Sequence, residues 1–102
     1  MEEAIKEIQK QLWRFGFGVK NYSGIAKCDL LVEGKWRVKI IFNKLFNPEI
    51  GTVATKGCDV VAVYTGGKKP NKFYSLLSPG YKISDGSGMF KDWTKSPKKI
   101  FK

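Results

Sequence analysis

The first part of the chain carries the hydrophobic spacing of an amphipathic helix. Four apolar residues of the stretch 2–15 recur at spacings of three and four, which places them on one helical face: Ile5, Ile8, Leu12 and Phe15. Glutamates come early and Arg14 comes late in this stretch, as the helix dipole favours. Because Gly16 and Gly18 follow, we expect the helix to end there and residues 17–22 to form a short extended strand.

Apolar and polar residues alternate further along the chain, which indicates a β-hairpin. Residues 29–33 and 35–42 form its two arms, and Gly34 between them supplies the positive φ that a tight turn needs. In the second arm every other residue is apolar, namely Trp36, Val38, Ile40 and Phe42. One face of this arm is therefore expected to be buried.

The second half of the chain predicts one short helix and two strands. Asn47 and Pro48 indicate a helix over residues 48–56, because Asn is a favoured N-cap and Pro a favoured first helical residue. Residues 60–64 are apolar throughout, which is typical of a central strand buried on both faces. Residues 72–77 predict a strand that pairs with residues 60–64.

These elements predict an α+β fold in a single domain, residues 1–102. A first αββ unit spans residues 1–45 and a second spans residues 46–77, and the two share a sheet core. Residues 78–102 form a basic C-terminal extension with a small predicted hairpin. The dipeptide Cys-Asp precedes a β-branched apolar run in both units. This repeat indicates either an internal duplication or two similar strand starts in one sheet.

The two cysteines, Cys28 and Cys58, belong to this repeat. A structural zinc site needs about four ligands, and the chain has no histidine to add to two thiolates. A disulfide needs Cα atoms within about 7 Å of each other, which sequence spacing does not decide. We therefore expect two buried free thiols, no metal and no cofactor.

Composition is that of a globular protein, with 42% hydrophobic and 14% aromatic residues. No apolar run approaches the roughly 18 residues of a membrane span, and the acidic N-terminus is unlike a signal peptide. We expect no membrane partner and a protein that is not secreted. The sequence leaves the oligomeric state open.

The charge of the chain points to a polyanionic partner. The formal net charge is +10, from 19 basic and 9 acidic residues, and phosphates neutralised by lysine release counterions that favour binding. A lysine-rich surface without histidine is also typical of hyperthermophilic proteins. The candidate nucleic-acid-binding residues are Lys20, Lys27, Lys35, Arg37, Lys39, Lys68 and Lys69.

Aromatic residues interleaved with lysines offer two interpretations. They could stack on unpaired bases, or they could simply fill the core, which is the commoner use of aromatics at strand spacing. The residues concerned are Trp36, Tyr64, Phe73, Tyr74, Tyr81, Phe90 and Trp93.

Residues 3 to about 77 resemble the PD-(D/E)xK nuclease superfamily. The resemblance is carried by an acidic residue in the first helix and by three further segments: residues 24–32, 37–39 and 59–64. It implies that Asp29 would be the first Mg²⁺ ligand and that Lys39 would position or activate water. Arg37 stands where the family has its second acidic ligand. The resemblance therefore implies a degenerate nuclease site in which Arg37 and Lys39 bind phosphate instead of a metal.

The chain as a whole resembles small proteins of filamentous viruses that infect hyperthermophilic archaea. This resemblance implies a place in the host cytoplasm or the virion, and a nucleic-acid or protein partner.

The sequence thus predicts a non-enzymatic binding protein, with nucleic acid bound at a basic face or in the groove between the two units. The first alternative is capture of an extended peptide at a free strand edge formed by Lys72, Tyr74 and Leu76. The second alternative is a metal-dependent nuclease.

Overall fold

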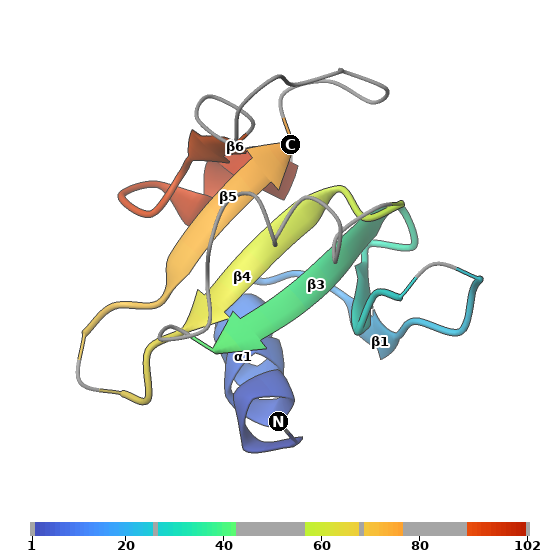
Figure 1. Ribbon diagram of the computed structural model, residues 1–102, viewed down its shortest axis with the longest axis horizontal. Coiled ribbons are helices and arrows are strands. Elements are labelled where there is room, and N and C mark those ends of the chain that lie inside the picture. The colour runs from blue at the N-terminus through green and yellow to red at the C-terminus, as the bar shows by residue number, and fades with distance from the viewer. Residues whose placement is uncertain (1, 26, 43–56, 68, 77–89, 102) are drawn as a thin grey trace.

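Figure 1 shows the computed structural model of the chain, which describes residues 2–25, 27–42, 57–67, 69–76 and 90–101. One helix, α1 (Glu2–Arg14), packs on one face of a β-sheet. The strands are β1 (Val19–Asn21), β2 (Leu30–Val32), β3 (Trp36–Phe42), β4 (Val60–Tyr64), β5 (Lys72–Leu76) and β6 (Phe90–Asp92). A short 3-10 helix, η2 (Pro97–Phe101), follows the last strand.

The sheet has six strands, and their order in space is their order in the chain. The pair β3 and β4 is parallel, with Val38 opposite Val60, whereas all other neighbours are antiparallel. The predicted α+β class is confirmed, and strands from both predicted units share one sheet. The helix predicted over residues 48–56 lies outside the described residues, so the internal duplication stays a prediction.

Helix α1 ends where its sequence predicts. The amide of Gly16 donates to the carbonyl of Trp13 at 2.9 Å, and the amide of Phe17 donates to the carbonyl of Leu12 at 3.1 Å. This pair of bonds is the Schellman motif, which requires a left-handed residue that glycine provides most easily; Gly16 has a φ of +96°. The helix therefore stops at a defined residue and turns the chain into β1.

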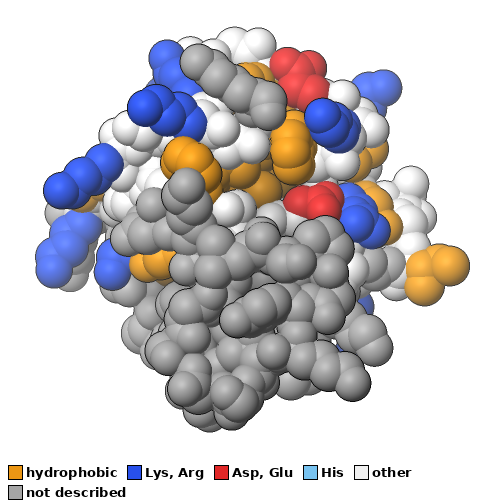
Figure 2. Space-filling view, turned by 90° about the horizontal axis from the view of Figure 1, so that it is seen from above, with side chains coloured by type: hydrophobic (Ala, Val, Ile, Leu, Met, Phe, Trp, Pro, Cys, Tyr) orange, Lys and Arg blue, Asp and Glu red, His pale blue; other side chains and the backbone are white. Residues whose placement is uncertain are grey.

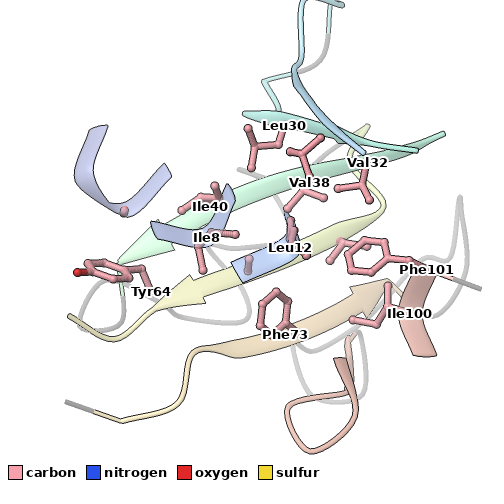
Figure 3. Close-up of a cluster of buried hydrophobic side chains, with 14 residues drawn as sticks. Ile8, Leu12, Leu30, Val32, Val38, Ile40, Tyr64, Phe73, Ile100 and Phe101 are labelled. Atoms are coloured by element: carbon pink, nitrogen blue, oxygen red, sulfur yellow. The ribbon is translucent and has the colours of Figure 1, made fainter. Parts of the chain in front are cut away.

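The core lies between α1 and the sheet, and Figure 3 shows it. Ile8 and Leu12 are fully buried against the strands, and each such burial stabilises the fold by about 1.5–3 kcal/mol. Strand β4 is buried along its whole length, as its apolar run predicts. The buried cluster comprises Ala4, Ile8, Leu12, Val19, Leu30, Val32, Val38, Ile40, Val60, Ala62, Tyr64, Phe73, Ile100 and Phe101.

The predicted hairpin is confirmed as the pair β2 and β3. Its turn has positive φ at two successive residues, 55° at Glu33 and 66° at Gly34. The amide of Lys35 donates to the carbonyl of Val32 at 3.0 Å and closes the turn. Two positive φ values of this kind define the type I′ turn, whose twist matches that of the flanking strands.

Within the predicted extension, residues 90–101 belong to the fold. Strand β6 pairs with β5 and completes one side of the sheet. Helix η2 then places Ile100 and Phe101 in the core, where the ring centroid of Phe101 lies 5.1 Å from that of Phe17. Within the described residues, no helix is long and apolar enough to cross a membrane.

Candidate functional site

The two Cys-Asp dipeptides lie on either side of β3. They directly precede β2 and β4, which are the two neighbours of β3 in the sheet. Cys28 and Cys58 form a disulfide, with their Cα atoms 6.0 Å apart. The expectation of two free thiols is therefore wrong. It failed because the order of the strands, which the spacing of 30 residues does not reveal, brings the two strand starts together.

Asp59 holds Arg37 by both its main chain and its side chain. The Asp59 Oδ2 atom accepts hydrogen bonds from the Arg37 amide at 2.9 Å and from Nε at 3.1 Å, and Oδ1 accepts from Nη2 at 3.3 Å. The amide of Asp59 donates in return to the Arg37 carbonyl at 2.8 Å. Asp59, with a smaller contribution from the Tyr22 hydroxyl, raises the pKa of Arg37 above its ordinary value. The charge of Arg37 is thus already matched inside the protein.

On the opposite side of β3, Asp29 likewise binds a main-chain amide and a basic side chain of the strand. Its Oδ2 atom accepts a hydrogen bond from the amide of Ile40 at 2.8 Å, and the Nζ of Lys39 lies 3.6 Å from the same oxygen. The amide of Asp29 donates to the carbonyl of Val38 at 2.8 Å. The side chains of Lys39 and Asp29 are only 22% and 18% exposed. This partly buried pair joins β2 to β3 where their main-chain ladder ends.

The structure brings together Asp29 and Lys39, the two candidates for a degenerate nuclease site. Arg37, at the position of the family's second acid, is bound to Asp59, so a second carboxylate does lie beside β3. Asp59 already accepts main-chain and side-chain hydrogen bonds, and Asp29 accepts a main-chain hydrogen bond and forms an ion pair with Lys39. Among the described residues, no three Asp, Glu, His or Cys side chains are grouped to hold a metal ion. The arrangement is that of a structural clamp on β3.

Part of the predicted basic set shares one face of the sheet. Lys20 is paired with Leu31, and Leu31 with Arg37, so the three side chains form a row across β1, β2 and β3. Lys39 follows two residues later on the same face, which is opposite α1 because the intervening Val38 is in the core. The structure therefore places Lys20, Arg37 and Lys39 on one face of the sheet.

The other predicted lysines are dispersed. Lys35 lies in the hairpin turn, and its Nζ stands 4.8 Å from the ring centroid of Trp36. Lys27 is exposed between β1 and β2. Lys69 follows β4 and is thus at the far end of that strand from Asp59. Lys68 lies outside the described residues, so the predicted set does not form a single patch.

Many cations of the described surface make no ion pair. The ion pairs of the described residues are Lys10 with Glu7, Arg37 with Asp59, and Lys39 with Asp29. Figure 2 shows Lys and Arg side chains on both sides of the view, with more of them on the left, where no acidic side chain is seen. The exposed cations that are outside these pairs are Lys6, Arg14, Lys20, Lys27, Lys35, Lys69, Lys72, Lys95, Lys98 and Lys99.

The strand edge predicted for peptide capture is not free. Tyr74 lies opposite Asp92 and Leu76 opposite Phe90, so β6 covers the outer side of β5. Lys72 is exposed, but it precedes this paired stretch. The prediction is wrong because the pattern of residues 89–93 indicated a local hairpin, whereas residues 90–92 pair with β5.

Two of the interleaved aromatic residues fill the core, which is the commoner of the two interpretations. Phe73 and Tyr64 are buried, which makes them core residues, and Trp36 is half-buried against the core. Tyr81 lies outside the described residues, and the side chain of Phe90 is not described. Sequence reasoning missed Trp13, which is 53% exposed on α1. On the helical wheel Trp13 lies about 100° from the buried Leu12 and is therefore off the apolar face, which was a signal for this.

Sequence reasoning also missed that Phe15 lies beneath a lysine. The Nζ of Lys98 stands 5.4 Å from the ring centroid of Phe15, although the two residues are at opposite ends of the chain. No local pattern could have placed them together.

Comparison with protein-family models, curated proteins and solved structures finds no match for this chain.

Proposed function

We propose that the protein binds nucleic acid through the phosphate backbone and does not catalyse a reaction. The supporting observation is the excess of exposed cations over ion pairs on the described surface, in a chain with a net charge of +10. Exposed, unpaired lysines are free to neutralise phosphates, and the counterions released in that exchange favour the complex. The proposed setting, which the resemblance to archaeal viral proteins implies, is the host cytoplasm or the virion.

The two ion pairs beside β3 indicate which cations would contact the nucleic acid. Arg37 and Lys39 are matched by Asp59 and Asp29, so together these four side chains add almost no net charge. A phosphate would have to compete with a carboxylate that already holds each cation. We therefore assign the contacts to the exposed lysines around this clamp, chiefly Lys20 on β1 together with Lys27 and Lys35.

The test is a salt titration of binding. Fluorescence anisotropy would follow labelled single-stranded and duplex DNA and RNA from low to high salt. The variant Lys20→Ala with Lys27→Ala is compared with Lys6→Ala with Lys69→Ala, which removes the same charge from α1 and from the β4–β5 connection. Each phosphate contact contributes about 0.9 to the slope of log affinity against log salt, so the first variant should reduce the slope by nearly two.

The result distinguishes a located interface from general positive charge. A smaller slope for the first variant alone supports the proposed surface. Equal losses in both variants would mean that binding follows net charge and has no preferred face. Absence of binding to all four nucleic acids near physiological salt would refute the proposal and direct the search to protein partners.

The nuclease alternative has one observation in its favour, the 3.6 Å approach of Lys39 to Asp29. It requires cleavage that depends on Mg²⁺ or Mn²⁺ and that Asp29→Ala abolishes. Incubation of the purified protein with single-stranded, duplex and branched DNA in either metal tests it. Our proposal expects all three substrates to remain intact.

A further inference from the structure

Three segments that are distant in sequence meet at one end of the molecule. They are the end of α1, the start of β3, and helix η2. The ring of Phe101 in η2 lies 6.3 Å from that of Trp36, and edge-on to it at 76°. Phe15 and Phe17 after the helix continue the same cluster, with their centroids 6.4 Å apart. We call this region the basic aromatic end, comprising Phe15, Lys35, Trp36, Lys98, Lys99 and Phe101.

Two rings of the basic aromatic end carry a lysine over one face. The ammonium group of Lys35 lies over Trp36 at 4.8 Å, and that of Lys98 lies over Phe15 at 5.4 Å. Both lysines are exposed and outside the ion pairs of the described residues, and both rings are half-buried. One side of each ring is thus packed on the core, while the other is covered by a flexible cation that solvent also reaches.

We infer that the basic aromatic end binds single-stranded nucleic acid, with an unpaired base stacked on Trp36 and phosphates held by Lys35, Lys98 and Lys99. This inference rests on the proposed function and specifies its substrate class. Aromatic platforms beside a basic track are the usual means of binding single strands without sequence preference. A duplex would not fit this role, because its bases are already stacked on each other and do not offer a free face.

The lysines that cover the rings are compatible with replacement by a stacked base. When a base stacks on Trp36, the ammonium group of Lys35 leaves the ring and pairs with the adjoining phosphate, so neither group is left without a partner. The cation–π contact at an exposed site is weak, whereas stacking of one base on an aromatic side chain typically changes affinity by about fivefold to a hundredfold. The cation–π contacts therefore do not prevent stacking.

The acidic residue nearest to Trp36 along the chain is Glu33, and it does not neutralise Lys35. Glu33 lies in the hairpin turn, where its Oε2 atom stands 3.5 Å from the position that a Cβ would occupy at Gly18. It is exposed and makes no ion pair with Lys35. Lys98 and Lys99 come from η2, in which no acidic residue occurs in the first turn. The region is thus predominantly positive.

The experiment compares the affinities of oligo(dT) and of a duplex of equal length for three proteins. Trp36→Leu removes the platform but retains an apolar side chain, and Trp13→Leu is the matched control, since Trp13 is more exposed but outside the cluster. We expect Trp36→Leu to weaken oligo(dT) binding by about fivefold to a hundredfold and to leave duplex binding unchanged. Trp13→Leu should alter neither affinity.

Trp36 also packs on Phe101, so each variant is first checked for folding by its near-ultraviolet circular dichroism. If Trp36→Leu does not fold, Trp36→Phe replaces it, because it keeps an aromatic contact with Phe101 but offers a smaller stacking face; a selective loss of oligo(dT) affinity is again expected. Equal loss for both nucleic acids, or no loss, overturns the inference and leaves the proposed function standing. Failure of the unsubstituted protein to bind either nucleic acid overturns both.

Discussion

Reduction of the bond between Cys28 and Cys58 should lower the free energy of unfolding by between 3 and 4 kcal/mol. The bond joins residues 30 apart in sequence and closes a loop that contains both arms of the hairpin. In the chain-entropy description, closing a loop of this length removes about 12 cal/mol/K of conformational entropy from the unfolded chain, which is about 3.6 kcal/mol at 25 °C. For a domain of this size that corresponds to a fall in Tm of roughly 15–30 °C.

The assay is unfolding by guanidinium chloride, and by heat in a calorimeter, with and without a phosphine reductant. The double variant Cys28→Ala with Cys58→Ala is the control, because its midpoint should not respond to the reductant at all. The reduced protein should also show a steeper dependence on denaturant, since its unfolded chain expands further and exposes more surface. The buried position of Cys58 means that the alanine variant loses some packing in addition.

Two results would refute this reasoning, and they differ in meaning. If alkylation and mass spectrometry find two free thiols in the folded, unreduced protein, then the cysteines are not linked. If the bond is present but its reduction changes the stability by less than about 1 kcal/mol, the loop-closure argument does not apply. In that case residual structure in the unfolded chain would already hold the hairpin segment together.

Substitutions at three further positions test the clamp, the turn and the core. Asp29→Ala should cost about 1–3 kcal/mol because the Ile40 amide loses its acceptor, whereas Asp29→Asn, which keeps an oxygen there, should cost less; equal losses on guanidinium denaturation would contradict this. Gly34→Ala should cost about 1 kcal/mol, since its φ of 66° disfavours a side chain; an unchanged midpoint would show that the turn is not strained. Burial raises the pKa of Tyr64, so the folded state resists ionisation and stability falls as the pH rises above 10; Tyr64→Phe should flatten this fall between pH 9 and pH 11 in urea unfolding.

The parts of the fold that could be predicted from the sequence are those with local causes. The spacing of Ile8 and Leu12 defines the buried face of α1 without reference to any other segment. Gly34 marks the turn between β2 and β3 because few other residues adopt its φ readily. The apolar run of β4 indicates a central strand because only a strand covered on both faces can bury every residue.

The parts that could not be predicted depend on which strands become neighbours. Asp59 and Arg37 are 22 residues apart, and nothing near either residue shows that they form a pair. The edge of β5 is covered by β6, which comes from beyond residues 77–89. The sequence therefore identifies the basic residues of the candidate face, but it does not show which acidic residues pair with them. The strongest members of this face, Arg37 and Lys39, turn out to be paired with acids.

The repeated Cys-Asp dipeptide has a physical explanation that does not require catalysis. In each copy the cysteine contributes to the shared disulfide, and the aspartate holds β3. Asp59 accepts a hydrogen bond from the amide of Arg37 and pairs with its side chain. Asp29 accepts a hydrogen bond from the amide of Ile40 and pairs with the side chain of Lys39. Arg37 and Lys39 are not free to bind phosphate while these aspartates hold them. It follows that substitutions of Asp29 and Asp59 should be read out mainly as changes in stability. Substitutions of Lys20, Lys35 and Trp36 should mainly change the affinity for nucleic acid. If stability and affinity respond to different residues in this way, Asp29 and Asp59 form a structural clamp with a binding surface around it, and not a degenerate catalytic centre.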